Sequence, residues 1–251
     1  MSRNDVTILC ATRNGADVVR LTLSSLRRST PEAYRILVAD NGSTDGTRDY
    51  LASLNWIEVF HRDPRRVLTS HGATLDWLAR KVRTRYFLTL DSDVVFLRRG
   101  WLSDLCEELE KHSAAAVGEF EPGIAGYRPR LAPYVLLFDT KRFRALHCSF
   151  RSCVLMSNSA DVRRWRRRRP SENLDLAELC AYPSGAFYST GARLFERIVQ
   201  SDLRWVSTPL RTRRKYHHLG HMSWGAGEAR FAADQRSKLT YVRKLLQRDK
   251  C

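Results

Sequence analysis

The sequence of 251 residues contains no long apolar run. No window approaches the roughly 18 uninterrupted apolar residues of a membrane-spanning helix. Residues Met1 to Asp5 contain no apolar stretch of signal-peptide length, so we expect a cytoplasmic protein. The six cysteines are scattered and fit no zinc-binding spacing. We therefore expect free thiols in a reducing compartment.

Acidic residues are few beside basic ones, with 27 Asp and Glu against 43 Lys and Arg and a net charge of +16. This imbalance favours anionic partners: nucleotide phosphates, a nucleic acid, or lipid phosphate at a membrane surface. Two phosphate-binding motifs are absent. No G-x-G-x-x-G follows the first apolar run, and no G-x-x-x-x-G-K-[ST] occurs. These absences argue against a dinucleotide-dependent oxidoreductase and a P-loop nucleotide hydrolase.

The first half of the chain alternates between apolar runs and segments of helical periodicity. Strands are predicted at 6–12, 35–40, 56–60 and 85–90, and the helices between them at 17–28, up to 54, and 71–82. This order is typical of an α/β fold with a mostly parallel, doubly wound sheet.

The pattern is less regular in the second half. A helix is predicted at 101–112 and another at 188–200, with strands at 114–120, 134–139, 153–156 and 203–206. Prolines 122, 129 and 133 predict connecting loops, because proline has no amide hydrogen to donate within a sheet.

Two carboxylates follow the strand at 85–90. Side chains alternate along an extended chain, so Asp91 and Asp93 would point to one side, toward one divalent cation, and Ser92 to the other. Open α/β sheets bind ligands at this carboxyl edge. The alternative is that both acids are solvated turn residues.

A family resemblance rests on three blocks and the segment between the last two. The blocks are Thr7 to Asn14, Val38 to Thr47, and Leu90 to Asp93. Between them, Gly72, Ala79, Tyr86 and Leu90 match the family pattern, and Asp76 replaces its asparagine. Over about residues 5–110 the chain resembles the nucleotide-sugar half of family-2 glycosyltransferases with the GT-A fold. The resemblance implies one GT-A domain over 1–251, with a nucleotide-sugar-binding half at 5–112 and an acceptor-binding half at 113–251.

The resemblance also implies roles for individual residues. Asp40 would accept the imide hydrogen of uracil or thymine, although it could instead only open an Asx-turn. Asp91 would hold the ribose hydroxyls or the metal, and Asp93 the metal, which would be Mn²⁺ or Mg²⁺. The residues expected to bind the donor are Thr12, Arg13, Asn14, Asp40, Asn41, Gly72, Asp91 and Ser92.

The general base is expected at the start of a helix after Ser171. The family places a Glu-Asp pair there, and this chain has Glu172 followed by Asn173. Asp175, one turn later, is the second candidate. Both acids could instead only stabilise the first turn of the helix.

Three histidines lie close together near the C-terminus. Imidazole is a good ligand for Mn²⁺-class metals, and several GT-A enzymes complete their metal site with a C-terminal histidine. His218 is our first candidate and His221 the second, on a mobile lid at 215–227 rich in glycine. A basic helix is predicted at 228–248.

The densest positive charge lies in a short run of arginines, which comprises Arg163, Arg164, Arg166, Arg167, Arg168 and Arg169. Such runs are commonly solvated segments. The functional alternative is peripheral docking to an anionic membrane surface or a phosphorylated acceptor. Nucleic-acid binding ranks third, because no recognised module surrounds the run.

These observations predict a metal-dependent, inverting glycosyltransferase. It would move a sugar from a UDP- or dTDP-sugar to the hydroxyl of a small molecule, a lipid-linked acceptor or a glycan. The alternatives are a nucleotidyltransferase, which would release pyrophosphate, and a non-catalytic protein that binds RNA or a membrane surface.

Overall fold

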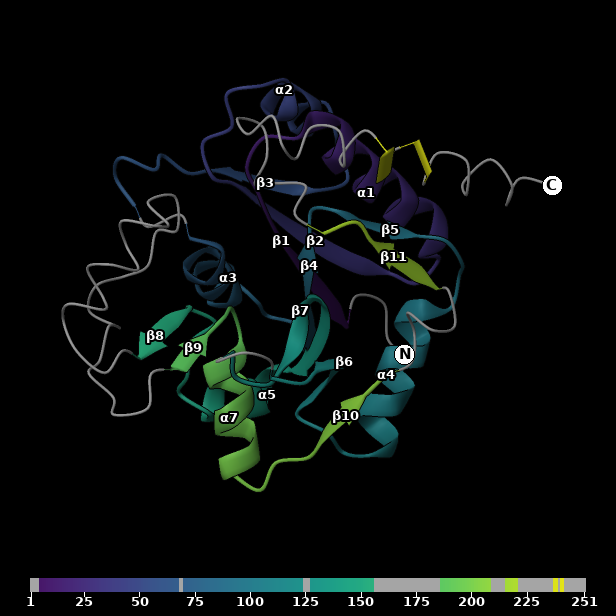
Figure 1. The fold of residues 1–251 in the computed structure, drawn as a ribbon. Coiled ribbons are helices and arrows are strands. Elements are labelled where there is room, and N and C mark those ends of the chain that lie inside the picture. The colour runs from purple at the N-terminus through teal and green to yellow at the C-terminus, as the bar shows by residue number, and fades with distance from the viewer. Residues whose placement is uncertain are drawn as a thin grey trace.

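A computed structural model describes residues 5–67, 70–123, 127–155, 186–208, 215–220, 237–238 and 240–241. Within these residues the main sheet has seven strands in the order β10-β6-β7-β4-β1-β2-β3 (Figure 1). Its strands are β1 (Val6–Thr12), β2 (Tyr34–Asp40), β3 (Glu58–His61), β4 (Tyr86–Asp91), β6 (Ala116–Glu121), β7 (Arg130–Asp139) and β10 (Trp205–Ser207).

Most of the sheet is parallel, as predicted. β4, β1, β2 and β3 are parallel neighbours, and β10 is parallel to β6. β7 is antiparallel to both β4 and β6, so the six other strands share one direction. β1 is buried along its whole length, because helices cover both faces of the sheet.

Side chains that alternate along the strands enter two separate cores. One core packs against α1 (Ala16–Ser29), α2 (Thr47–Ala52) and α4 (Trp101–Lys111), and contains Ile8, Val38 and Leu88. The other packs against α3 (His71–Ala79), α5 (Thr140–Ala145) and α7 (Ala192–Gln200), and contains Leu9, Leu37 and Phe87. The period of two along each strand explains this division.

Two small antiparallel sheets complete the described fold. β5 (Val94–Phe96) pairs with β11 (Tyr216–His218), and β8 (Cys153–Leu155) pairs with β9 (Ala186–Tyr188). In Figure 1, β11 comes from the yellow-green end of the chain and lies beside β5, close to the end of β4. A segment distant in sequence is thereby brought to the carboxyl edge of the main sheet.

Two predictions for the second half are wrong. Pro133 lies inside β7, not in a loop, at the point where the pairing of β7 with β6 shifts in register. Its carbonyl accepts a hydrogen bond of 2.7 Å from Thr89 Oγ1. The helix predicted from residue 188 begins at Ala192, because Gly191 takes a positive φ of 83° and the residues before it form β9.

Cys10, Cys106 and Cys148 are free thiols, as predicted for these three. Burial, followed by nearby carboxylates, raises the pKa of Cys106 to about 12, so this thiol is unreactive at neutral pH. In the described part of the chain, no helix is both long enough and apolar enough to span a membrane.

Candidate active site

The carboxyl ends of four parallel strands lie in register at one edge of the sheet. Thr12 is paired with Asp40, Asp40 with His61, and Ala11 with Asp91. Parallel strands direct their carboxyl ends to the same side, so polar residues that follow separate apolar runs are collected at this edge.

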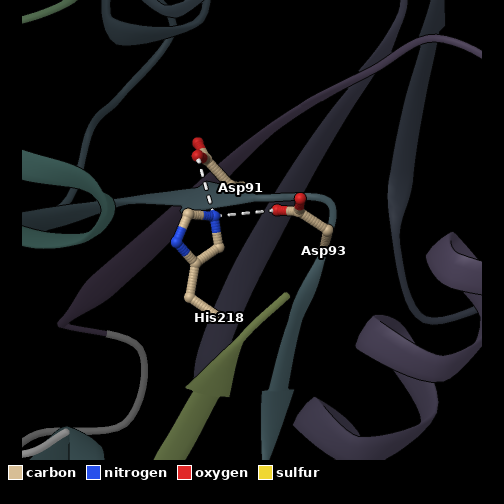
Figure 2. Close-up of side chains that lie close together, drawn as sticks. All are labelled: Asp91, Asp93 and His218. Carbon is tan, nitrogen blue, oxygen red and sulfur yellow. Dashed lines mark ion pairs between the residues drawn. The ribbon is translucent and has the colours of Figure 1, made fainter. Parts of the chain in front are cut away.

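Asp91, Asp93 and His218 form a compact group at this edge (Figure 2). His218 Nε2 lies 3.2 Å from Asp93 Oδ1 and 3.8 Å from Asp91 Oδ2. One ligand atom from each side chain can be chosen so that all three lie within 4.8 Å of one another. The group therefore offers two carboxylate oxygens and one imidazole nitrogen to a single point.

The two carboxylates converge for a reason other than the one predicted. β4 ends at Asp91, a turn contains Ser92 and Asp93, and β5 begins at Val94. The turn, and not the alternation of an extended strand, directs both acids to one side. Ser92 is buried, and its carbonyl accepts a hydrogen bond of 2.8 Å from Thr22 Oγ1 in α1.

The ionisable side chains of this group shift one another's pKa values. Burial raises the pKa of Asp91 and the Asp93 charge adds to this, while His71 and His218 oppose it. Burial lowers the pKa of His218, but its hydrogen bond with Asp93 and the charges of both aspartates outweigh burial and raise it. Cationic charge is thus favoured between the two carboxylates.

Two further side chains define the surroundings of the group. His71, the first residue of α3, places Nε2 3.2 Å from Asp91 Oδ1. This pair lacks hydrogen-bond geometry, so Asp91 Oδ1 is buried without a hydrogen bond from the described residues. Tyr134 of β7 stacks on the His218 ring, with centroids 4.2 Å apart. The stack orients the imidazole toward the carboxylates.

Asp40 is fully buried and holds the turn that follows β2. Its Oδ1 accepts hydrogen bonds from the amide and the hydroxyl of Ser43. Its Oδ2 lies 3.2 Å from His61 Nδ1 and 3.7 Å from Arg48 Nε. Ser43 lies three residues after Asp40, not the two of an Asx-turn, so the carboxylate holds its own turn as the alternative required but through a different hydrogen bond.

The loop after β1 is tied to the loop after β2. Asn14 donates its amide to Ser43 Oγ at 2.7 Å, and its Oδ1 accepts from the amide of Thr44. Asp45 Oδ2 accepts from the amide of Gly15 at 2.7 Å. Arg13 is exposed on this loop, and Thr12 Oγ1 is buried with no hydrogen bond from the described residues.

A buried polar network lies beneath this edge. Asn41 Oδ1 accepts from Thr74 Oγ1 at 3.1 Å and from Arg62 Nη1 at 3.3 Å. Arg62 Nη1 also donates to Thr74 Oγ1. The arginine lies over the Trp77 ring, 5.1 Å from its centroid. Of the residues predicted to bind the donor, Asn41 thus has a clear structural role.

The need for glycine at position 72 also has a structural reason. A Cβ on this residue would lie 2.5 Å from the carbonyl oxygen of Phe150 and 2.6 Å from the Cα of Arg151. The backbone that follows α5 passes directly over the first turn of α3. Asp76, on the same helix, accepts hydrogen bonds from the Phe150 amide at 2.9 Å and from Ser149 Oγ.

Several predicted residues lie outside the described residues. These are Glu172, Asp175, His221 and the arginines at positions 163, 164 and 166–169. The predicted lid at 215–227 is described only for 215–220, and there it is not displaced from the site. Residues 216–218 form β11, and the Leu219 amide donates to the Asp93 carbonyl at 2.9 Å.

Sequence reasoning did not identify His61 or Arg62 as part of the edge, and it treated His71 only as a helix-face residue. His61 directly follows the strand predicted at 56–60 and is the last residue of β3, and Arg62 comes next. Polar residues at the carboxyl end of that strand were the available signal, by the same rule that selected Asp40 and Asp91.

The sheet and the carboxylate pair at its carboxyl edge define the GT-A fold of glycosyltransferases. The model of glycosyl transferase family 2 matches residues 7–197, and the chain belongs to that family. No curated protein sequence matches the chain.

Solved structures also resemble the chain, at low sequence identity. S. aureus TarS 1-349 in complex with UDP-GlcNAc is 15% identical, with a TM-score of 0.46, over 58% of this chain and 48% of that one. The mannosyltransferase PcManGT from Pyrobaculum calidifontis, in complex with GDP-Man and Mn²⁺, is 17% identical, with a TM-score of 0.48, over 60% and 48%. The chain spans about half the length of these two proteins.

Proposed function

We propose that this protein is a metal-dependent glycosyltransferase that takes its sugar from a nucleoside diphosphate sugar, with UDP or dTDP as the nucleotide. The observation that supports this most directly is the convergence of Asp91, Asp93 and His218 at the carboxyl edge of the sheet. A family-2 glycosyltransferase that uses a metal needs such a ligand group beside the place where the diphosphate binds.

The three residues fit a small divalent cation. Two ligand atoms on one such ion lie no more than about 4 Å apart, twice a bond of roughly 2.1 Å. His218 Nε2 and Asp93 Oδ1 already lie within that limit, and the buried Asp91 Oδ1 lacks a hydrogen bond from the described residues. Mixed oxygen and imidazole ligands suit Mn²⁺, and Mg²⁺ is the second choice. Such an ion would neutralise charge on the departing diphosphate.

The protein's own residues would position the donor and remove a proton from the acceptor. The tied loops after β1 and β2 form the edge on which the nucleoside would lie. Glu172 or Asp175 would be the base that takes the proton of the acceptor hydroxyl as its oxygen attacks the anomeric carbon. Attack opposite the leaving diphosphate would invert the configuration at that carbon.

A nucleotide-release assay over a panel of UDP-, dTDP- and GDP-sugars tests this proposal. The wild-type protein should release nucleoside diphosphate with Mn²⁺ and lose this activity when the metal is chelated. Asp93→Asn should be inactive with every donor. Asp202→Asn, which changes an exposed acid after α7, should match the wild type. Wild-type turnover in Asp93→Asn would refute the metal role.

Two other functions give different results in the same setting. A nucleotidyltransferase would release pyrophosphate from a nucleoside triphosphate and a sugar phosphate. A non-catalytic protein would bind RNA or anionic vesicles with steep salt dependence and show no turnover. The net charge of +16 is the observation that supports this last function. The same charge supports peripheral docking of the protein to a membrane.

A further inference from the structure

Glu119 is a half-buried acid of β6 that the proposed chemistry leaves unused. It lies where the pairing of β6 with β7 shifts in register. The shift leaves Glu119 on β6 and Tyr134 on β7 outside the regular pairing of these two strands. Irregular pairing of this kind redirects side chains and is common beside functional sites.

Two tyrosines lie next to the Glu119 carboxylate. Tyr216 of β11 is 1% exposed, and its hydroxyl donates to Glu119 Oε2 at 3.4 Å. The Tyr134 hydroxyl is buried and has no hydrogen bond of good geometry within the described residues. Burial raises the pKa of Tyr134, and its interaction with the neighbouring Glu119 carboxylate adds to this. Glu119 is therefore close to both hydroxyls.

The same two tyrosines lie next to His218. Tyr216 and His218 are two residues apart on β11, so their side chains project to the same face of that strand. The Tyr134 ring stacks on the His218 ring and meets the Tyr216 ring edge-on, with centroids 6.2 Å apart. Tyr134, Tyr216 and His218 thus form one aromatic layer. Glu119 contacts this layer through the tyrosines, and Asp93 contacts it through His218.

The aromatic layer supplies what backbone pairing cannot. Pairing of β11 with β5 fixes where the backbone of His218 lies, but it does not by itself fix the side-chain torsions. The imidazole must direct one nitrogen to the point that the two carboxylates face. Ring packing restricts its rotation, and the contacts with Glu119 restrict the rings on which it packs.

We propose that Glu119 is a positioning residue of the metal site, which acts through Tyr216 and Tyr134 to fix the ring orientation in which His218 binds Mn²⁺. This inference rests on the proposed function, because it assumes that His218 and the two carboxylates hold a metal. Glu119 would act as a hydrogen-bond acceptor. Glutamine can replace it in that role, and leucine cannot.

Calorimetric titration with Mn²⁺ tests the assignment. Glu119→Leu should bind Mn²⁺ about tenfold more weakly than the wild type, at the lower end of the typical loss for an outer partner of a metal ligand. Glu119→Gln should retain most of the wild-type affinity. Tyr216→Phe, which removes only the hydroxyl, should also weaken binding. The loss in the double variant of Glu119→Leu and Tyr216→Phe should be smaller than the sum of the single losses, because both remove one contact.

Pulsed electron paramagnetic resonance of bound Mn²⁺ separates positioning from stability, because it detects a nitrogen coupled to the ion. At saturating Mn²⁺ the wild type should show coupling to an imidazole nitrogen, and His218→Ala should lack it. Glu119→Leu should show weaker coupling than the wild type, and Glu119→Gln should restore it. Urea unfolding establishes that each variant is folded.

Tyr188→Phe is the matched control. Tyr188 is also buried and also donates its hydroxyl to a carboxylate, Glu196, at 3.0 Å. It lies on β9, which pairs with β8 in a different sheet from β11. Tyr188→Phe should therefore bind Mn²⁺ as the wild type does.

Three results would overturn the role of Glu119 and leave the proposed function intact. The first is wild-type Mn²⁺ affinity and nitrogen coupling in folded Glu119→Leu. The second is an equal loss in Glu119→Gln and Glu119→Leu, because charge would then account for the effect. The third is wild-type affinity in Tyr216→Phe, which decides the matter if Glu119→Leu does not fold. Failure of the folded wild type to bind Mn²⁺ would overturn both this role and the metal dependence of the proposed function.

Discussion

Asp93 and His218 lie 3.2 Å apart because β5 and β11 are antiparallel neighbours. Asp93 immediately precedes β5, and His218 lies directly opposite Val94, the first residue of that strand. Backbone pairing therefore places the imidazole beside the carboxylates. Sequence distance between the two residues plays no part in the geometry of the site.

Removal of the His218 imidazole should weaken Mn²⁺ binding. Loss of an outer partner of a metal ligand typically costs about 10–100-fold in affinity, and loss of a ligand should cost at least as much. We expect His218→Ala to bind Mn²⁺ at least about tenfold more weakly in calorimetric titration, with His112→Ala as the control. Wild-type affinity in His218→Ala would exclude His218 as a ligand.

His218→Ala also removes the stack of His218 on Tyr134, so its effect on stability must be measured separately from its effect on Mn²⁺ binding. Loss of an aromatic stack costs about 0.5–1.5 kcal/mol, so His218→Ala should also lower the free energy of unfolding by about that amount. His218→Phe keeps a ring over Tyr134 but has no nitrogen. It should recover stability and still bind Mn²⁺ as weakly as His218→Ala does.

Gly72→Ala should destabilise the protein. The new Cβ would lie 2.5 Å from the Phe150 carbonyl oxygen, which belongs to the backbone and cannot move as a side chain end can. We expect a loss of about 1–3 kcal/mol in urea unfolding. Gly46→Ala is the control, because its Cβ would meet nothing closer than 4.0 Å. Equal stability of the two variants would contradict the close approach of α3 and the segment at 150–151.

Asp76→Asn should change how stability depends on pH. Burial raises the pKa of Asp76, although its hydrogen bonds with Ser149 and Phe150 oppose this. The folded state then holds the proton more tightly than the unfolded state, and stability falls as pH rises from about 4 to the raised pKa. Asparagine cannot ionise, so this part of the fall should disappear.

Urea unfolding of the wild type and Asp76→Asn across that pH range measures the effect. The asparagine amide can still accept from the Phe150 amide and donate to Ser149 Oγ, so both contacts remain available. At neutral pH the variant should equal or exceed the wild type in stability. An unchanged pH profile would show that Asp76 does not titrate within this range.

Thr74→Val should disrupt the buried network of Asn41 and Arg62. Valine has a similar shape but no hydroxyl, so both polar partners lose a hydrogen bond inside the protein. An unsatisfied buried group costs about 1–3 kcal/mol, and more where a charge is involved. Urea unfolding measures the loss, with the exposed Thr44→Val as the control. Wild-type stability in Thr74→Val would show that solvent replaces the hydroxyl.

The parallel part of the fold was predictable because its signals are local. The apolar runs at 6–12 and 35–40 and the helical spacing at 17–28 each lie within one element, and the structure confirms them with shifts of one residue at their ends. The second half was predicted less well. Pro133 enters β7 because a register shift with β6 removes the need for its missing amide hydrogen, and such a shift depends on a partner strand.

Some residues of the candidate site were likewise predictable from local sequence, and others were brought there only by the tertiary structure. Asp91 and Asp93 follow a buried strand, so the chain order placed them at the carboxyl edge, although a turn and not strand alternation makes them converge. His61 and His71 joined the edge only through packing. Strand register set His61 beside Asp40, and the position of α3 set His71 beside Asp91. Among the three histidines near the C-terminus, the pairing of β11 with β5 distinguished His218 from its immediate neighbour, His217. Periodicity reports which face of an element is apolar, but it carries no information on which distant element covers that face.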